Sequence, residues 1–351
     1  MENTKTLKDI SWQVTEEEYR ADPAYSYSTI AKFTREGFEK LDKLFDKVES
    51  PSLLFGSMVD TLLTDGQEAF DERFFVADFP EIPDTIKKIV DSMYDNLADE
   101  YMSITDIPDK ILLPYIDMHD YQRNWKAETR CKVVKEKATE YYHLKHLSEG
   151  KQVVSSKLYE DTLACIEALK TSEATRWYFA EDNPFDGIQR YYQLKFKGEY
   201  EGIQLRCMAD LIICDTVNKV IIPCDLKTSY KIEDNFYKSF IEWSYFEQAS
   251  LYAEIIKQNI AKYEEFKDYK VLDYRFIVIS NGTKKPLVWE WPLTHALGDI
   301  KFENLVLPDW RNKVKELHYY LTVSNNHKIG INTTTTNNIK TWIEKDYGER
   351  L

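Results

Sequence analysis

The sequence is poor in cysteine, glycine and proline, and it lacks long apolar runs. Its five cysteines are spread through 351 residues without a C-x-x-C pair, so we expect no disulfide framework and no zinc or iron–sulfur site. No segment approaches the roughly 20 apolar residues of a membrane-spanning helix. The opening residues, MENTKTLKDISWQV, lack the apolar stretch of a secretory signal. These absences predict a cytoplasmic protein that does not bind a membrane.

Motifs of several common enzyme classes are also missing. There is no G-x-S-x-G, G-x-x-x-x-G-K-[ST] or G-x-G-x-x-G segment, so a hydrolase triad and a nucleotide-binding loop have no support. The six histidines show no H-E-x-x-H pattern. The net charge of −14 differs from that of simple nucleic-acid binders, which are basic. An acidic exterior is still compatible with basic residues confined to one groove.

The composition is that of a folded protein, with 43% hydrophobic and 14% aromatic residues. Apolar residues first recur at helical spacing and later alternate as they do in strands. Helices are expected over 22–48, 51–64, 84–100, 115–146, 152–180, 234–261 and 297–323, and strands over 188–197, 203–214, 219–227, 271–280 and 286–291.

This order of elements predicts an α/β or α+β fold with a helical N-terminal portion. Pro80 and Pro83 indicate a loop with short extended pieces over residues 65–85. The expected organisation is an N-terminal tail (1–23), a single domain (24–323) with a mainly helical part (24–180) and a catalytic sheet and helix part (188–323), and a C-terminal loop with a short helix (324–351).

Three charged side chains lie within apolar runs in the strand-rich part. Asp225 and Lys227 are two residues apart in CDLKTS, so in a strand their side chains point to one face. Asp210 lies in the preceding strand, within MADLII, and approaches Asp225 if the two strands pair through the turn at 215–218. Charged side chains that enter a core from adjacent strands need compensating partners.

A hard divalent cation would remove the repulsion between the two carboxylates. Mg²⁺, for which Mn²⁺ can substitute, takes oxygen ligands and commonly one or two carboxylates together with substrate phosphate. The predicted ligands are Asp210, Asp225 and the backbone carbonyl of Leu226. Lys227 would orient water or stabilise charge on the phosphate. Alternatively, the aspartates end strands and Lys227 is solvated, because a D-x-K triplet alone is common.

The helix expected after this strand carries two polar residues on one face. Gln248 and Tyr252 are four residues apart, and Tyr245 joins them. A buried amide and phenol at this place can hold a nucleic-acid backbone or support the acids. An aromatic core helix with one satisfied glutamine is the alternative.

Together, these segments resemble a known nuclease family. GIQLRCMAD, PCDLKTS and EQASLY are similar to the G-x-x-x-R-x-x-D, D-x-K-T and Q-x-x-x-Y series of RecB-like PD-(D/E)xK nucleases, with the closest resemblance to the phage and prophage exonuclease VIII (RecE-type) branch. SYSTIAKF and LLFGSMVDTLL resemble that branch's opening helix and its G-x-x-x-His helix. The resemblance covers roughly residues 24–310 and implies a restriction-endonuclease-like core, with a central mixed sheet flanked by helices.

The resemblance also implies an activity. It implies a Mg²⁺-dependent exonuclease that hydrolyses DNA from linear duplex ends in the 5′-to-3′ direction, in phage-type recombination within a bacterial host cell. It further implies a homo-oligomer and a single-strand annealing recombinase as a partner. The residues that match the family's positions are Asp210, Asp225 and Lys227 in catalysis, and Arg206, Thr228, Gln248 and Tyr252 in support of the site or in DNA binding.

Three positions are unusual. Asp60 stands where the family usually has a metal-binding histidine. Because aspartate is a competent ligand for Mg²⁺, Asp60 is included among the predicted ligands, with a place on a wet helix face as the alternative. Gln193 replaces an acid that related sequences often carry, which puts a second metal in doubt. Pro223 within a strand predicts a bulge or an edge.

Two other functions remain open. A catalytically weak or inactive relative that binds DNA or a partner protein would also fit the missing histidine and the net charge of −14. A structural or interaction protein with an accidental D-x-K would have Asp210, Asp225 and Lys227 scattered through its fold.

Overall fold

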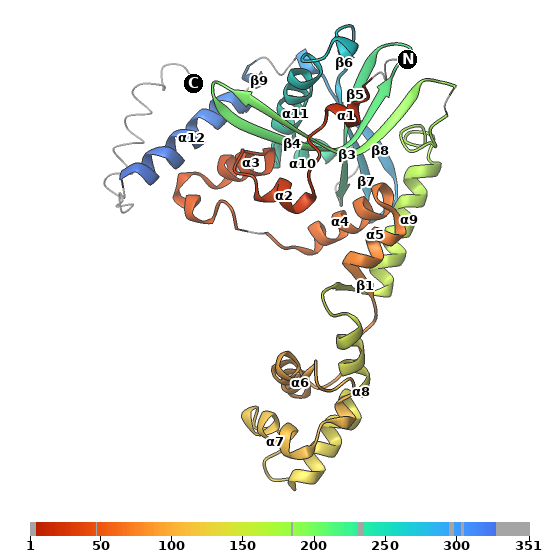
Figure 1. The fold of residues 1–351 in the computed structure, drawn as a ribbon, viewed down its shortest axis with the longest axis vertical. Coiled ribbons are helices and arrows are strands. Elements are labelled where there is room, and N and C mark those ends of the chain that lie inside the picture. The colour runs from red at the N-terminus through yellow and green to blue at the C-terminus, as the bar shows by residue number, and fades with distance from the viewer. Residues whose placement is uncertain are drawn as a thin grey trace. The chain divides into compact units, whose positions relative to one another are not determined.

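The computed structural model describes residues 5–46, 48–183, 185–230, 235–294, 298–302 and 305–327. The chain divides into two compact units (Figure 1). Unit 1 comprises residues 1–49, 172–280 and 286–351, and unit 2 comprises residues 50–171 and 281–285. The single domain predicted over 24–323 thus corresponds to parts of both units.

Unit 1 is built around a six-stranded sheet (Figure 1). Its strands are β3 (Ile188–Tyr200), β4 (Ile203–Asp215), β5 (Val220–Ser229), β6 (Lys270–Val271), β7 (Tyr274–Ser280) and β8 (Pro286–Trp291). They lie in the order β3-β4-β5-β7-β8, with β6 beside β5. β4 is antiparallel to β3 and β5, whereas β5 is parallel to β7. The predicted α/β fold, with a central mixed sheet flanked by helices, is confirmed.

Helix α11 (Tyr245–Ile260) packs on β3, β4 and β7 and is buried along most of its length. Gly198 permits this close approach, because a Cβ there would lie 2.9 Å from Ile255 Cγ1 and 2.8 Å from Gln258 Oε1. The other elements of unit 1 are α1 (Leu7–Ile10), α2 (Glu16–Ala21), α3 (Tyr27–Glu36), α10 (Phe236–Glu242), α12 (Trp310–His327), the short helical turns η1 (Phe38–Lys43) and η4 (Glu264–Phe266), and the hairpin of β9 (Ile300–Phe302) and β10 (Leu305–Leu307).

The N-terminal residues, which were predicted to form a tail, pack into unit 1. Thr6 and Thr15 form capping boxes at the starts of α1 and α2. Leu7, Ile10 and Tyr19 are buried. The pattern was overlooked because helices of four and six residues are too short to show a clear helical period.

The side-chain alternation of β4 slips by one residue at Asp210. The β4 residues in the core cluster are Ile203, Leu205, Cys207 and Ala209 before this point, and Ile212 and Cys214 after it. On β3, Gln193 holds the position opposite Asp210, since the flanking pairs are Tyr192 with Leu211 and Leu194 with Ala209. Gln193 has a φ of 52°, a left-handed conformation that is strained for a residue with a side chain. The side-chain alternation of β4 therefore changes at a predicted site residue.

Pro223 lies neither at an edge nor in a bulge. It pairs in register with Ile212 of β4, in a central strand. On the other side of β5, Pro223 falls between β6, which ends at Val271, and β7, which begins at Tyr274. Because no residue of these two strands pairs with Pro223, its missing N–H is tolerated within the sheet.

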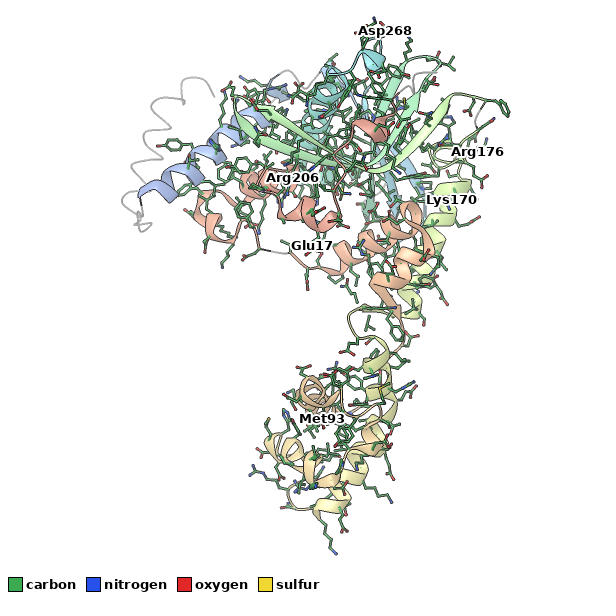
Figure 2. The ribbon with its side chains drawn as sticks, in the orientation of Figure 1. Glu17, Met93, Lys170, Arg176, Arg206 and Asp268 are labelled. Carbon is green, nitrogen blue, oxygen red and sulfur yellow. The ribbon has the colours of Figure 1, made fainter. Side chains whose placement is uncertain are left out.

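Unit 2 is mainly helical. It contains α4 (Pro51–Thr64), α5 (Gly66–Arg73), β1 (Phe74–Val76), α6 (Asp84–Leu97), η2 (Ile104–Asp106), α7 (Asp109–Met118), α8 (Ala127–Leu147), β2 (Gln152–Val154) and α9 (Ser156–Thr171). One apolar cluster joins α4, α5, α9 and the parallel pair β1–β2, and another joins α6, α7 and α8 around Met93 (Figure 2). Helix α4 keeps its predicted bounds because Ser50 caps it and Pro51 suits its first turn.

Several predicted segments differ from the observed ones. Residues 66–73 form α5 instead of a loop. The helix expected over 234–261 is broken between α10 and α11, where Ser244 has a left-handed φ of 56°. The hairpin of β9 and β10 replaces the start of the last predicted helix, which begins at Trp310. Predicted structure over 328–351 lies outside the described residues. No helix within the described ranges is both long and apolar enough to cross a membrane.

Candidate active site

Asp210 and Asp225 lie on adjacent strands where the pairing of β4 with β5 ends. The last pair of the ladder is Leu211 with Cys224, so the two aspartates hold the next position on each strand. The Oδ2 atom of Asp210 accepts a hydrogen bond of 2.9 Å from the backbone N–H of Leu226. The structure thus brings the Asp210 carboxylate to the backbone of β5, directly beside Asp225.

Asp225 is 2% exposed, and both of its carboxylate oxygens have partners. Gln248 Nε2, on α11, donates to Oδ1 at 2.5 Å, and the Lys227 ammonium forms an ion pair with Oδ2. A buried carboxylate is costly unless it has such partners. The amide and the ammonium therefore compensate the charge of Asp225 and hold its orientation.

Lys227 is largely buried, with 18% of its side chain exposed. Burial lowers the pKa of its ammonium, but the negative charge of Asp225, together with Tyr245 and Asp210, outweighs this and raises the pKa above its ordinary value. The ammonium also lies 4.8 Å from the ring centre of Tyr245. Lys227 therefore stays protonated at neutral pH beside Asp225.

The buried face of α11 carries both Gln248 and Tyr252. The Tyr252 ring packs edge-to-face on Tyr27 and on Tyr274, with ring centres 6.5 Å apart in each pair. Burial raises the pKa of Tyr252 well above its ordinary range, so the phenol stays protonated. Gln248 Oε1 and Tyr274 Oη are buried without a hydrogen-bond partner among the described residues. No polar motif in the sequence singles out Tyr27 or Tyr274.

Arg206, labelled in Figure 2, contacts the N-terminal segment of unit 1. Its guanidinium donates to the carbonyl of Tyr19 and, at 2.7 Å, to that of Asp22, and it lies 4.8 Å from the Tyr19 ring centre. Arg206 therefore caps the end of α2 and holds it against β4. Thr228 pairs in register with Ile279 of β7. The DNA-binding roles expected for both residues stay predictions.

Asp60 belongs to unit 2, in α4. Thr64 Oγ1 donates to its backbone carbonyl at 3.0 Å. Arg73 of α5 donates to Ser57 Oγ at 3.1 Å and to Thr61 Oγ1 at 3.0 Å. These contacts tie α5 to the polar stripe of α4 that includes Asp60. The role of Asp60 as a metal ligand stays a prediction.

The donor set on β4 and β5 fits a divalent cation. Mg²⁺ needs only one or two protein carboxylates, because waters and substrate phosphate complete its shell. Gln248, which donates to Asp225, has a buried Oε1 without a hydrogen-bond partner among the described residues, so it can accept one more hydrogen bond there. In the parts of the chain that the structure describes, no cluster of three or more His, Cys, Asp or Glu side chains forms a metal cage. The arrangement suits an open site and not a closed structural one.

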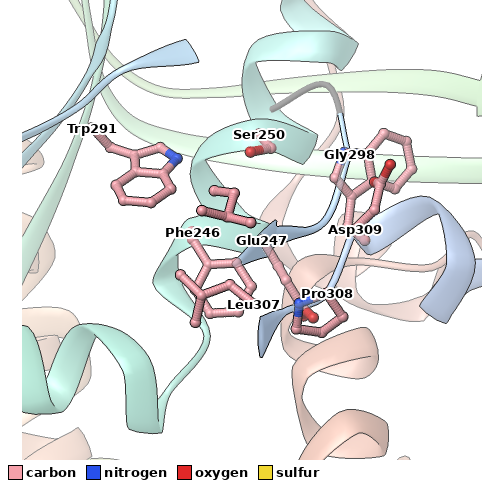
Figure 3. A pocket seen from close by; sticks show the side chains of 10 residues that line it. Phe246, Glu247, Ser250, Trp291, Gly298, Leu307, Pro308 and Asp309 are labelled. Carbon is pink, nitrogen blue, oxygen red and sulfur yellow. The ribbon is translucent and has the colours of Figure 1, made fainter. Parts of the chain in front are cut away.

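Glu247, next to Gln248, was not predicted. It is 1% exposed, and neither carboxyl oxygen has a hydrogen-bond partner among the described residues. Burial raises the pKa of Glu247 to about 8, against the opposing charges of Lys313 and Arg35. Its one signal in the sequence is a glutamate within the aromatic segment YFEQASLY. Glu247 lines a small pocket (Figure 3) with Phe246, Ser250, Trp291, Gly298, Ile300, Leu307, Pro308, Asp309 and Trp310.

Comparisons with known proteins find a likeness among solved structures. No protein-family model matches the chain, and no curated protein matches it. Among solved structures, the chain is similar to the crystal structure of a Eubacterium rectale protein named "Putative exonuclease", with 15% sequence identity and a TM-score of 0.45, over 90% of this chain and 88% of that chain.

Proposed function

We propose that the chain is a metal-dependent nuclease of the PD-(D/E)xK type, which hydrolyses DNA phosphodiester bonds with Mg²⁺ or Mn²⁺. The observation that supports this most is the meeting of Asp210, Asp225 and Lys227 at one point of the sheet, with Gln248 holding Asp225. An accidental D-x-K motif would not be expected to bring a second acid and a buried amide to the same place.

The side chains have distinct proposed roles. Asp210 and Asp225 hold the cation, with Asp60 and the Leu226 carbonyl as further proposed ligands. When bound, the metal supplies Lewis acidity to the phosphodiester and lowers the pKa of a bound water. Lys227, a fixed cation, stabilises negative charge on the phosphate or orients the attacking water. Arg206, Thr228, Gln248 and Tyr252 are proposed to support the site or to bind DNA.

The finer proposal rests on the resemblance of the sequence motifs. It is a 5′-to-3′ exonuclease that acts on linear duplex ends in phage-type recombination. It works as a homo-oligomer beside a single-strand annealing recombinase, in the cytoplasm of a bacterial host.

Digestion of end-labelled linear duplex with Mg²⁺, Mn²⁺ or EDTA tests the function. We expect nucleotide release only with metal, and none from Asp225→Asn. The labelled end reports the polarity. Asp268→Asn, which removes a surface ion pair with Lys219, is the matched control and should cleave like wild type. Wild-type protein that leaves duplex and single strands intact with every metal would overturn the proposal.

A second candidate function is binding of DNA or a protein partner without cleavage. It is favoured by Asp60 in place of the family's usual histidine and by the net charge of −14. Retention of labelled DNA without any metal-dependent release would support it.

A further inference from the structure

A tryptophan and an arginine of unit 1 form an exposed stack. Trp243 is 42% exposed although it is large and apolar. The guanidinium carbon of Arg35 lies 4.8 Å from the centre of its ring. Arg35 is exposed, and no carboxylate among the described residues forms an ion pair with it. The pair thus offers an aromatic surface and a cation that forms no ion pair with a described carboxylate.

The turn that carries Trp243 is held rigidly. Its backbone carbonyl accepts a hydrogen bond of 2.5 Å from Tyr27 Oη, and its N–H donates to Ser239 O at 3.0 Å. The next residue, Ser244, is 5% exposed and adopts the left-handed conformation that starts α11 in a new direction. The ring is therefore presented from a fixed backbone, so binding to it would cost little ordering of the chain.

The stack lies beside the cluster formed by Asp210, Asp225, Lys227 and Gln248. Tyr245, two residues after Trp243, contacts the Lys227 ammonium. Burial raises the pKa of Tyr245, and the positive charges of Lys227 and Arg35 both oppose this rise. Tyr27, which donates to the Trp243 carbonyl, also packs on Tyr252 of α11. The stack and the Lys227 ammonium therefore lie in one region of unit 1.

A second stack in unit 1 provides a contrast. Trp177 is 43% exposed, and the guanidinium carbon of Arg190 lies 5.6 Å from its ring centre. Arg190, however, pairs with Asp182 at 2.8 Å and donates to the carbonyls of Trp177 and Tyr178. Its side chain is only 4% exposed. The protein itself therefore uses Arg190, whereas Arg35 has no such partners among the described residues.

We propose that Trp243 and Arg35 form a subsite for single-stranded DNA, in which a nucleobase stacks on Trp243 and Arg35 binds a neighbouring phosphate. The proposal rests on the proposed nuclease function and specifies its substrate, a strand with unstacked bases next to the cleaved bond. Stacking on an aromatic ring suits a nuclease without sequence preference, since every base has a π-face. Arginine matches phosphate through its fork of N–H donors.

Fluorescence anisotropy with a labelled oligothymidine tests the subsite. It is measured in EDTA, so that binding is read without metal-dependent hydrolysis. We expect Trp243→Ala to weaken binding roughly tenfold, and Trp243→Phe to retain most of it. Arg35→Ala should reduce the slope of log affinity against log salt by about 0.7, the value for one phosphate contact on a single strand. Trp177→Ala, the matched control, should bind like wild type.

Two results would overturn the subsite. One is equal binding by wild type and Trp243→Ala, and the other is an equal loss in Trp177→Ala. Thermal unfolding of each variant, together with the Trp243→Phe result, separates loss of the ring from misfolding. If wild type cleaves DNA but Trp243→Ala binds the oligothymidine as wild type does, the subsite is rejected and the nuclease function is kept. Weakened binding in Trp243→Ala, with no cleavage by wild type under any metal, would reject the nuclease function and retain the subsite.

Discussion

Two carboxyl groups near Gln248, one on β5 and one on α11, are almost equally buried but differ in their partners. Asp225 is 2% exposed and contacts the Gln248 amide and the Lys227 ammonium. Glu247, in α11 itself, is 1% exposed and has no hydrogen-bond partner among the described residues. Burial alone therefore does not decide how a carboxyl group behaves in this protein; the groups around it do.

The difference separates a carboxyl group that titrates from a cluster of matched charges. The cluster at Asp225 matches a negative charge with a fixed positive one, which suits a site for metal and phosphate. Glu247 has a pKa of about 8, so it carries a proton at neutral pH. We expect Glu247 to couple the stability of the fold to pH, and the cluster to control cleavage.

The largest expected effect is that of Lys227→Ala. Loss of the cation should slow metal-dependent cleavage at least about 100-fold. It should also destabilise the fold by roughly 3–5 kcal/mol, because Asp225 is left buried without its ion-pair partner. Initial rates on end-labelled duplex and urea unfolding measure the two effects. The double variant Asp225→Asn/Lys227→Met should regain stability but not cleavage. If Lys227→Ala cleaves DNA as fast as wild type, the assignment of the cluster is wrong.

Glu247→Gln should remove a pH dependence of stability. The pKa in the folded state, about 8, lies above the ordinary value of 4.5. The contribution of Glu247 is therefore complete below pH 4.5 and is lost as the pH rises through about 8. At about 1.4 kcal/mol per pKa unit, wild type should lose a few kcal/mol over this range. Urea unfolding from mildly acidic to mildly alkaline pH measures it, and equal pH profiles for variant and wild type would contradict it.

Gln248→Leu tests the amide that holds Asp225. Removal of this donor should cost about 1–3 kcal/mol of stability, and we expect cleavage to slow by about tenfold through loss of alignment. Gln258→Leu is the matched control on the same helix, since Gln258 donates to the Glu199 carbonyl and not to the cluster. It should leave cleavage unchanged. Equal cleavage losses in both variants would show that the position of α11 matters more than this hydrogen bond.

Gly198→Ala should move α11 without touching either carboxyl group. The added Cβ would press on Ile255 and Gln258 and cost about 1–3 kcal/mol. We expect this loss at every pH, with an unchanged metal requirement. Thermal unfolding at several pH values checks the first point, and a metal titration of cleavage checks the second. If the pH dependence of stability changed in Gly198→Ala, the position of α11 would also affect Glu247, and the two carboxyl groups would not be independent.

Local sequence features predicted much of the fold. Helix α4 and strand β8 have the bounds that were expected, because a serine cap, an N-terminal proline and strict alternation act over a few residues. Helix α5 and the hairpin of β9 and β10 were missed. Their short patterns carry few core positions, so periodicity gives little information about them.

The candidate site was predictable only in part. The spacing of Asp225 and Lys227 and the order of the motifs predict that both residues lie near Asp210 and Gln248, as the contacts show. Glu247 was missed because its burial comes from the hairpin of β9 and β10 and the start of α12, elements distant in sequence from α11.

Local sequence accounts for the alternation of the strands, the helix caps and the D-x-K spacing, since these depend on neighbours within a few residues. The slip at Asp210, the break at Ser244 and the different surroundings of Asp225 and Glu247 arise from tertiary packing. These features depend on which distant segments supply a hydrogen bond, a charge or an apolar wall. Such partners are chosen when the core packs, and no local pattern records them.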